Sequence, residues 1–173
     1  MMGRHHARLL QDTPGVSFAG AVDPAGDQHG AVRDREKLFP SIAALLAAGA
    51  PDFAILALPT EEHLAGAREL AAAGVHLLIE KPLAATADAG REILAACQRG
   101  GVLAAVGHVE RCNPALVEMR RRIGEGQLGE IFLIATERVG PFPNRIRDVG
   151  VVKDLATHDL DLVRWIGGAP IAR

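Results

Sequence analysis

Four short apolar runs punctuate the first two-thirds of the sequence. They are residues 16–22, 53–58, 76–79 and 102–106. Their hydrophobic residues are mostly consecutive rather than alternating with polar ones, which is typical of parallel strands covered on both faces of a sheet. This pattern predicts that the four runs are strands of a parallel sheet.

Two segments between these runs have the composition of helices. Residues 61–73 are rich in alanine, begin with acidic residues and stop at Gly74, which suits a left-handed helix cap. Residues 86–99 follow the same scheme, with Thr86 as N-cap and glycines at the exit. Strands that alternate with helices predict right-handed crossovers and a doubly wound α/β fold.

The pattern changes after Gly107. Here we predict a helix over 114–123, a strand over 131–137 that alternates more than the earlier ones, and a helix over 152–166. We therefore divide the chain into an α/β domain, residues 1–107, and the beginning of an α+β domain, residues 108–173.

Composition excludes several classes of protein. The 173 residues are 49% hydrophobic and 23% charged, as in soluble globular proteins, and the net charge of −2 predicts binding to neither nucleic acid nor a membrane surface. Two cysteines, Cys97 and Cys112, are too few for a disulfide framework, and we expect both to be buried as small apolar groups. No signal peptide or membrane-spanning run is recognisable, so we expect a cytoplasmic protein.

Two motifs carry candidate chemistry. Glu80-Lys81-Pro82 stands where an apolar strand ends, and proline after lysine permits a cis peptide bond. Asp154 and His158 are four residues apart, which places both on one face of a helix. An amine, a carboxylate and an imidazole at the mouth of a sheet can hold a hydroxyl group and remove its proton. The alternatives are a surface lysine and a helix-capping role for Asp154 and His158.

A metal site is a further alternative for the second motif, because carboxylate and imidazole at this spacing can bind zinc. Further ligands could come from His108, Glu110, Asp159 and Asp161. No cysteine or second histidine shares the face of Asp154 and His158, so we predict no metal.

Several motifs in order resemble one family. They are Met2-Gly3-Arg4-His5-His6-Ala7-Arg8, Val22-Asp23-Pro24, Leu58-Pro59-Thr60-Glu61-Glu62-His63, Glu80-Lys81-Pro82 and Asp154-x-x-x-His158. Together they resemble the glucose–fructose oxidoreductase/inositol dehydrogenase/rhizopine catabolism family of two-domain, NAD(P)-dependent oxidoreductases. Residues 107–114 and 148–155 look more like its UDP-N-acetylglucosamine 3-dehydrogenase branch. The resemblance implies that residues 1–107 are a dinucleotide-binding domain of Rossmann type and that residues 108–173 begin the substrate domain. It also implies oxidation of a sugar hydroxyl, here C3 of a UDP-linked amino sugar.

The resemblance also implies roles for individual residues. His158 would remove the hydroxyl proton, Lys81 would stabilise the developing alkoxide, and Asp154 would orient the sugar or Lys81. Residues expected to bind the cofactor are Gly3, Arg4, Asp23, Pro59, Thr60, His63 and Glu80. Residues expected to contact substrate are His108, Glu110, Arg111, Asn113 and Arg145.

Each of these residues has a simpler interpretation. Asp23 at the end of a strand favours NAD over NADP through hydrogen bonds to the ribose, but it could be an acidic turn residue. Thr60 could N-cap the next helix, and a lone helical histidine such as His63 is often structural. The substrate-contacting residues could instead form surface salt bridges.

The sequence departs from the family at its start. The family's first strand and the first two glycines of its Gly-x-Gly-x-x-Gly loop have no counterpart here, and only Gly3 matches the third. In a sheet of order 3-2-1-4-5-6, the strands at 16–22 and 53–58 would then lack the neighbour between them. We therefore expect a fragment truncated at both ends. It could be an inactive fragment or a non-enzymatic sugar- or nucleotide-binding protein, whereas an intact homologue would form a homo-oligomer.

Overall fold

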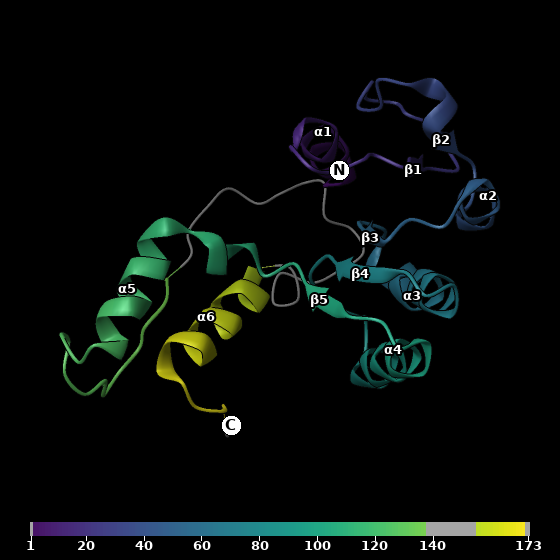
Figure 1. Ribbon diagram of the computed structural model, residues 1–173. Coiled ribbons are helices and arrows are strands. Elements are labelled where there is room, and N and C mark those ends of the chain that lie inside the picture. Colours follow the sequence, from purple (N-terminus) through teal and green to yellow (C-terminus); the bar gives the residue numbers. More distant parts are fainter. Residues whose placement is uncertain (1, 138–154, 172–173) are drawn as a thin grey trace. The chain divides into compact units, whose positions relative to one another are not determined.

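The computed structural model describes residues 2–137 and 155–171. The chain divides into two compact units, Met1–Val106 and Gly107–Arg173 (Figure 1). The first unit contains five short strands: β1 (Ala21–Val22), β2 (Leu38–Phe39), β3 (Phe53–Leu56), β4 (His76–Ile79) and β5 (Ala104–Val106). Its helices are α1 (Gly3–Asp12), η1 (Arg35–Lys37), α2 (Ile42–Ala48), η2 (Thr60–Glu62), α3 (His63–Ala72) and α4 (Ala87–Gly100).

The strands form two parallel sheets rather than one. β1 pairs with β2, with Ala21 opposite Leu38. The second sheet has the order β3-β4-β5, with Phe53 opposite His76 and Leu77 opposite Ala104. The prediction of parallel strands connected by helices is therefore confirmed, and the first unit is an α/β fold of Rossmann type.

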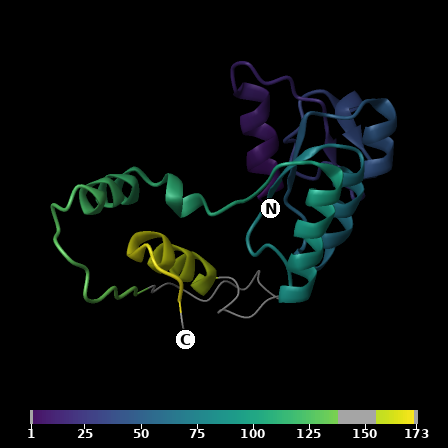
Figure 2. The same cartoon turned by 60° about the horizontal axis from the view of Figure 1, so that its bottom comes forward.

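Helices cover the strands on both faces. α3 and α4 pack against each other, α2 contacts α3, and α1 contacts β3; Figure 2 shows α1 on the side of the strands opposite α2, α3 and α4. The core lies between the β3-β4-β5 sheet and helices α3 and α4. Its most deeply buried members include Ala67, Leu70, Val75, Ile79 and Ile93.

Side-chain caps explain where several helices begin and end. The Thr86 hydroxyl accepts a hydrogen bond from the Ala89 N–H at the start of α4, as predicted, and the Ser41 hydroxyl does the same for α2. Gly74 follows α3 and its C-cap Ala73 at φ +77°, the left-handed conformation expected there, and the Gly74 N–H bonds to the Ala71 carbonyl. Thr60 is not the N-cap of α3: it belongs to η2, a 3₁₀ turn that precedes the helix, and its side chain makes no capping bond.

Two strand predictions differ from the structure. Residues 16–20 do not join β1, because only Ala21 and Val22 lie beside a described partner strand. Residues 131–137 form no strand, since no other described segment pairs with them. The side chains of Phe132 and Leu133 are consequently more than 80% exposed. The backbone N–H and C=O groups of a strand need hydrogen-bond partners on a neighbouring strand. The sequence pattern of one segment does not show whether such a neighbour exists.

The second unit contains η3 (Val109–Cys112), α5 (Pro114–Gly124) and α6 (Thr157–Gly167). The Asn113 side chain caps α5 by accepting a bond from the Ala115 N–H. Among the described residues no helix is long and apolar enough to cross a membrane. Cys97 is buried, as predicted. The prediction for Cys112 is wrong: its side chain is exposed, and it lies in η3, a short 3₁₀ turn in which no residue is buried.

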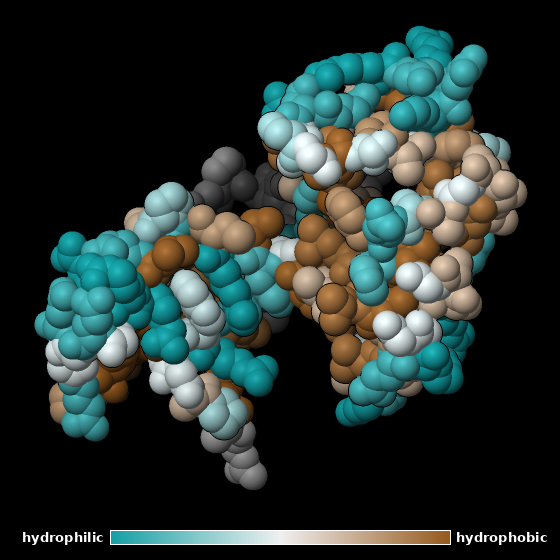
Figure 3. All heavy atoms as spheres, viewed as in Figure 1, coloured by the Kyte–Doolittle hydropathy of each residue, from teal (hydrophilic) through white to brown (hydrophobic). Residues whose placement is uncertain are grey.

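Hydrophobic side chains are not confined to the core. Figure 3 shows them at the surface across the middle of the first unit. The large apolar residues of the first unit that are exposed include Leu9, Phe53, Leu94 and Leu103. Phe53 begins β3, so the sheet itself contributes an exposed apolar side chain.

Candidate functional site

Lys81 follows directly after β4, at the carboxyl end of the β3-β4-β5 sheet. The Lys81–Pro82 peptide bond is cis, the form that the sequence permits. Ile79 at the end of β4 is fully buried, and the Lys81 side chain is half-buried. Because β4 lies between β3 and β5, its end is held from both sides.

Glu80 is buried beside Lys81 and bonded to a residue from a distant part of the chain. Its Oε1 lies 2.7 Å from His6 Nε2 on α1, and its Oε2 accepts a weaker bond of 3.3 Å from the Lys81 N–H. The hydrogen bond from His6 is the main cause that lowers the pKa of Glu80, although burial opposes it, and the Lys81 ammonium adds a smaller attraction. Glu80 therefore holds a negative charge next to Lys81 and links the end of β4 to α1.

Sequence reasoning did not identify His6. It missed the residue because two histidines stand side by side, and only the structure tells which of them faces inward. His6 is half-buried and bonded to Glu80, whereas His5 is exposed. The available signal was the spacing of Gly3 and His6, which lie about one helical turn apart, so that His6 follows the predicted cofactor residue Gly3 on the same side of the helix.

The first turn of α1 suits an anion. It contains Gly3 and Arg4 and no acidic residue, and a helix N-terminus carries a partial positive charge. A Cβ added to Gly3 would lie 3.7 Å from the Cβ of Ala57, so the start of α1 is close to the residue that follows β3.

A groove of about 930 Å³ brings together several of the predicted cofactor residues. The predicted residues that line it are Gly3, Arg4, Asp23 and Pro59. The groove runs between β1 and β3, and strand residues such as Val22 and Ile55 line its length. Gly3 and Asp23, which are twenty residues apart in sequence, thus share one cavity.

Asp23 ends β1 and begins an extended loop. Its Oδ1 accepts a bond of 2.9 Å from the Ala25 N–H, which is the acidic turn interpretation, and the carboxylate is exposed. The turn and a role in binding a ribose are compatible, because a carboxylate has further acceptor positions.

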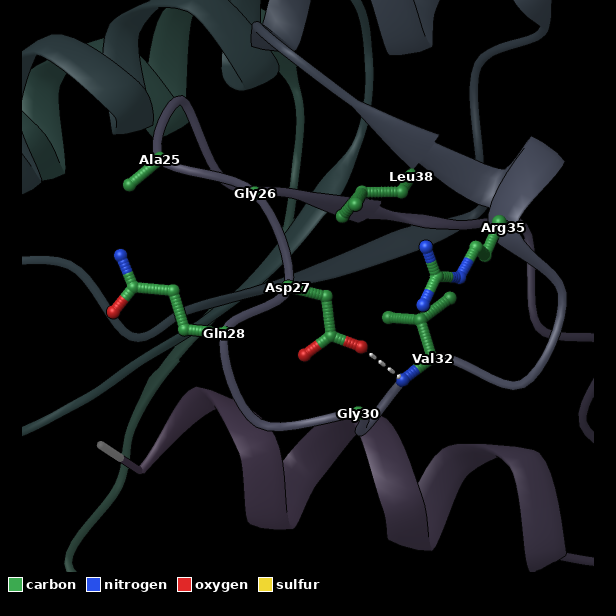
Figure 4. Close-up of a pocket in the computed structure, with 8 residues that line it drawn as sticks. All are labelled: Ala25, Gly26, Asp27, Gln28, Gly30, Val32, Arg35 and Leu38. Atoms are coloured by element: carbon green, nitrogen blue, oxygen red, sulfur yellow. Dashed lines mark hydrogen bonds between the residues drawn. The ribbon is translucent and has the colours of Figure 1, made fainter.

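A smaller pocket of about 360 Å³ lies within this loop (Figure 4). Its lining residues are Ala25, Gly26, Asp27, Gln28, Gly30, Val32, Arg35 and Leu38. The Asp27 carboxylate accepts a 2.8 Å bond from the Val32 N–H, and this bond is the main cause that lowers the pKa of Asp27. Figure 4 shows the Arg35 side chain directed into the pocket and that of Gln28 directed away from it. Sequence reasoning did not select this loop, whose glycines and aspartates signalled only turns.

Thr60 and His63 are buried rather than exposed to a cavity. The His63 ring lies between two backbone carbonyls, with Nδ1 3.1 Å from the Leu83 oxygen and Nε2 3.1 Å from the Leu58 oxygen. Those carbonyls belong to the segments that follow β3 and the Lys81–Pro82 bond. His63 therefore ties the two segments together, which is the structural role weighed for a lone histidine.

In the second unit, two of the predicted substrate residues contact the same carboxylate, that of Asp161. The Arg111 guanidinium donates two hydrogen bonds to Asp161, of 2.8 and 2.5 Å, and its carbon lies 6.0 Å from the centre of the Trp165 ring. His108 Nδ1 is 3.7 Å from Asp161 Oδ2. Arg111 and His108 thus share Asp161 as a partner, and Asn113 caps α5. Their contact with a substrate stays a prediction.

Two of the remaining predicted residues are described by the structure and two are not. His158 occupies the first turn of α6 and is half-buried, and Glu110 lies in η3. Asp154 and Arg145 lie outside the described residues. Lys81 belongs to the first unit and His158 to the second, so their convergence stays a prediction. Among the described residues, no group of three or more His, Cys, Asp or Glu is arranged to hold a metal ion.

Comparison with known proteins adds independent information. A family model described as an oxidoreductase family with an NAD-binding Rossmann fold matches residues 1–108. The UDP-N-acetylglucosamine 3-dehydrogenase of Acidithiobacillus ferrooxidans is 34% identical over 171 residues, covering 97% of this chain and 52% of that protein. Inositol 2-dehydrogenase 2 of Saccharopolyspora erythraea is 29% identical over 177 residues, covering 99% of this chain and 52% of that protein.

A solved structure agrees with these relatives. The WlbA dehydrogenase from Bordetella pertussis, crystallised in complex with NADH and UDP-GlcNAcA, matches with a TM-score of 0.73 and 26% identity. The match covers 95% of this chain and 51% of that one. The chain therefore spans about half the length of the relatives it matches.

Proposed function

Since this chain belongs to the NAD-binding Rossmann-fold oxidoreductase family, we propose that it provides the nucleotide-binding half of an enzyme that oxidises a secondary hydroxyl of a sugar or nucleotide sugar. In this proposal residues 1–107 bind NAD and residues 108–173 begin the substrate domain. The observation that carries the proposal is the end of β4, where Lys81 follows a buried carboxylate fixed by α1.

The residues around the groove fit a dinucleotide. The first turn of α1 has Arg4 and no acid, so it suits a pyrophosphate, and Gly3 leaves room for close approach. The exposed Asp23 carboxylate at the end of β1 suits a ribose hydroxyl and would repel a 2′-phosphate, which favours NAD over NADP. Bound NAD would accept a hydride from the substrate.

The chain's own residues would handle the proton. His158 would take the hydroxyl proton, since an imidazole suits a base near neutral pH. The Lys81 ammonium would donate a hydrogen bond to the oxygen as negative charge develops on it. Asp154 would orient the sugar or Lys81, and Glu80, held by His6, would keep a compensating negative charge beside Lys81.

A UDP-linked N-acetylhexosamine oxidised at C3 is the substrate we favour. The relative at 34% identity is named for that reaction, and the WlbA complex contains a UDP-sugar. The inositol dehydrogenase at 29% identity makes a cyclitol the alternative. Absorbance at 340 nm with NAD and either UDP-N-acetylglucosamine or myo-inositol distinguishes them, and a response to myo-inositol alone would reject the favoured substrate.

Calorimetric titration with NAD tests the cofactor separately from the reaction. Heat of binding without turnover would indicate a nucleotide-binding protein that is not catalytic by itself, and no heat at millimolar NAD would indicate an inactive fragment. Lys81→Ala should abolish hydride transfer and leave NAD binding unchanged. Lys37→Ala, in the same unit but on η1, is the matched control and should retain both.

A further inference from the structure

Asp161 on α6 carries a buried carboxylate that Arg111 of η3 pairs with. The Asp161 side chain is 8% exposed, and both of its oxygens accept a hydrogen bond from Arg111. The bond from Nε to Oδ2 is 2.8 Å long, and the bond from Nη2 to Oδ1 is 2.5 Å long. A bidentate pair of this kind keeps a buried carboxylate ionised and makes the two groups together nearly neutral.

His108, the residue that precedes η3, lies beside the same carboxylate. Its Nδ1 is 3.7 Å from Asp161 Oδ2, which is beyond hydrogen-bond distance, and this nitrogen is buried with no hydrogen-bond partner among the described residues. The Arg111 N–H bonds to the His108 carbonyl, so the two residues are one 3₁₀ turn apart and their side chains lie on one side of η3. Arg111 thus holds the oxygen that a protonated His108 would otherwise bind.

His158 lies on the same face of α6 as Asp161. The two residues are three positions apart in the helix, so their side chains are neighbours, and Trp165 continues this face four positions after Asp161. Arg111 reaches Trp165 as well, with its guanidinium carbon 6.0 Å from the centre of the ring. η3 therefore contacts the face of α6 that contains His158, and two imidazoles lie near one carboxylate.

α5 and α6 both contact η3, and the three elements contain further charged residues. These are Glu110 on η3, Asp159 and Arg164 on α6, and Glu118, Arg120, Arg121 and Arg122 on α5. Residues one or two positions apart in a helix do not face each other, so Asp159 does not share the face of Asp161, nor Glu110 that of Arg111. Glu118 is bonded to Arg121 and Arg122 of its own helix. Of the described cations, only Arg111 is bonded to Asp161.

We propose that Arg111 is a positioning residue that acts on two histidines through Asp161. By cancelling the charge of this carboxylate, it keeps His108 and His158 as neutral imidazoles, the form that accepts a proton. Without the guanidinium, Asp161 would stabilise an imidazolium instead, because an opposite charge within about 4 to 6 Å favours the charged form. The inference deepens the proposed function and rests on it in taking His158 as the base, and it requires no contact between Arg111 and the substrate.

NMR titration of the imidazole nitrogens in the full chain tests this inference without cofactor or substrate. Arg111→Met removes the charge and keeps an apolar side chain against Trp165. It should increase the proton affinity of His108 at least about tenfold, and that of His158, a helical turn from Asp161, about threefold. Arg164→Met removes an exposed arginine from the same helix as a matched control, and should change either affinity by less than about twofold.

Further variants separate the charge of Arg111 from its packing. Arg111→Lys keeps the charge without the bidentate geometry, and both histidines should then titrate within about twofold of the wild type. Asp161→Asn leaves the guanidinium without its carboxylate and should lower the proton affinity of His108 at least about threefold. The double variant Arg111→Met/Asp161→Asn removes both charges and should titrate like the wild type. If Arg111→Met does not fold because a buried carboxylate is left unpaired, Asp161→Asn and the double variant still provide the test.

Several results would overturn the inference. They are wild-type titration of both histidines in Arg111→Met or of His108 in Asp161→Asn, a change at His108 alone in Arg111→Met, and a double variant that titrates like Arg111→Met. Failure of Arg111→Lys to restore the titration would assign the effect to packing and would also overturn it. The titrations decide on Arg111 whether or not the chain transfers hydride to NAD, so the absence of hydride transfer would reject the proposed function separately.

Discussion

β4 and β1 are both parallel strands of the first unit, but their surroundings differ. β4 lies between two other strands, and its Leu77 and Ile79 are 4% and 0% exposed. β1 has one neighbour among the described strands, and both of its residues are only half-buried. The residues that follow β4 are accordingly fixed by buried contacts, whereas β1 borders an open groove. Position within a sheet, more than local sequence, separates a rigid site from an accessible one.

The largest effect should come from shortening a core side chain of β4. Ile79→Ala removes a fully buried side chain and should lower the free energy of unfolding by about 2 to 5 kcal/mol. Val22→Ala on β1 is the matched change and should cost about 1 kcal/mol or less, since its side chain is half-buried. Urea denaturation of both variants measures the difference. Equal losses in the free energy of unfolding would show that the Ile79 and Val22 side chains stabilise the fold equally.

The bond between His6 and Glu80 should rank second. His6→Leu leaves the buried Glu80 carboxylate without its main partner and should cost about 1.5 to 3 kcal/mol, the range for hydrogen bonds to charged groups. His5→Leu alters the exposed neighbour and should change stability by less than about 0.5 kcal/mol. Should both variants denature at the same urea concentration, the bond would not stabilise the fold.

The pH dependence of stability should follow from the same pair. The pKa of Glu80 is lowered in the folded state from its ordinary value of 4.5, so its contribution is complete above that value and declines as pH falls through the folded-state pKa. Stability of the wild type should therefore decrease more steeply below pH 4.5 than that of His6→Leu. Denaturation curves collected between pH 3 and pH 6 would measure this, and parallel profiles would contradict it.

The smallest effect should come from the β1 side. Lys37 donates a 2.7 Å bond from its ammonium to the Phe18 carbonyl, which ties the segment before β1 to the end of η1. Lys37→Met keeps most of the side chain and should cost about 0.5 to 1 kcal/mol, because a half-exposed donor is easily replaced by water. Amide exchange of Ala21 and Val22 should become faster while that of Ile79 does not change. Faster exchange at Ile79 as well would mean that the two sheets are coupled.

Sequence pattern predicted best where an apolar run is continuous or a helix has a distinct cap. The apolar run 76–79 is β4 without adjustment, and Thr86 caps α4 as expected. The predicted helix over 152–166 ends within one residue of α6. The helix α2 was not predicted, although Ser41 provides a cap, because seven residues rich in alanine give little periodicity.

Contacts between distant segments could not be predicted. His6 and Glu80 are 74 residues apart, and no local pattern shows that one histidine of a pair faces the end of β4. The resemblance assigns His63 to cofactor binding, and no local pattern shows that its ring lies between the Leu58 and Leu83 carbonyls. The false strand at 131–137 has the same origin, since alternation indicates a suitable segment but not a neighbour to pair with.

The cation–π pair of Arg111 and Trp165 has a practical consequence for spectroscopy. Trp165 is the sole tryptophan of the chain, which contains no tyrosine, so near-ultraviolet fluorescence excited at the indole band originates entirely from the second unit. Circular dichroism at the peptide band records both units. A mismatch between the two optical melting curves would therefore show directly that the halves of the molecule lose their structure at different temperatures.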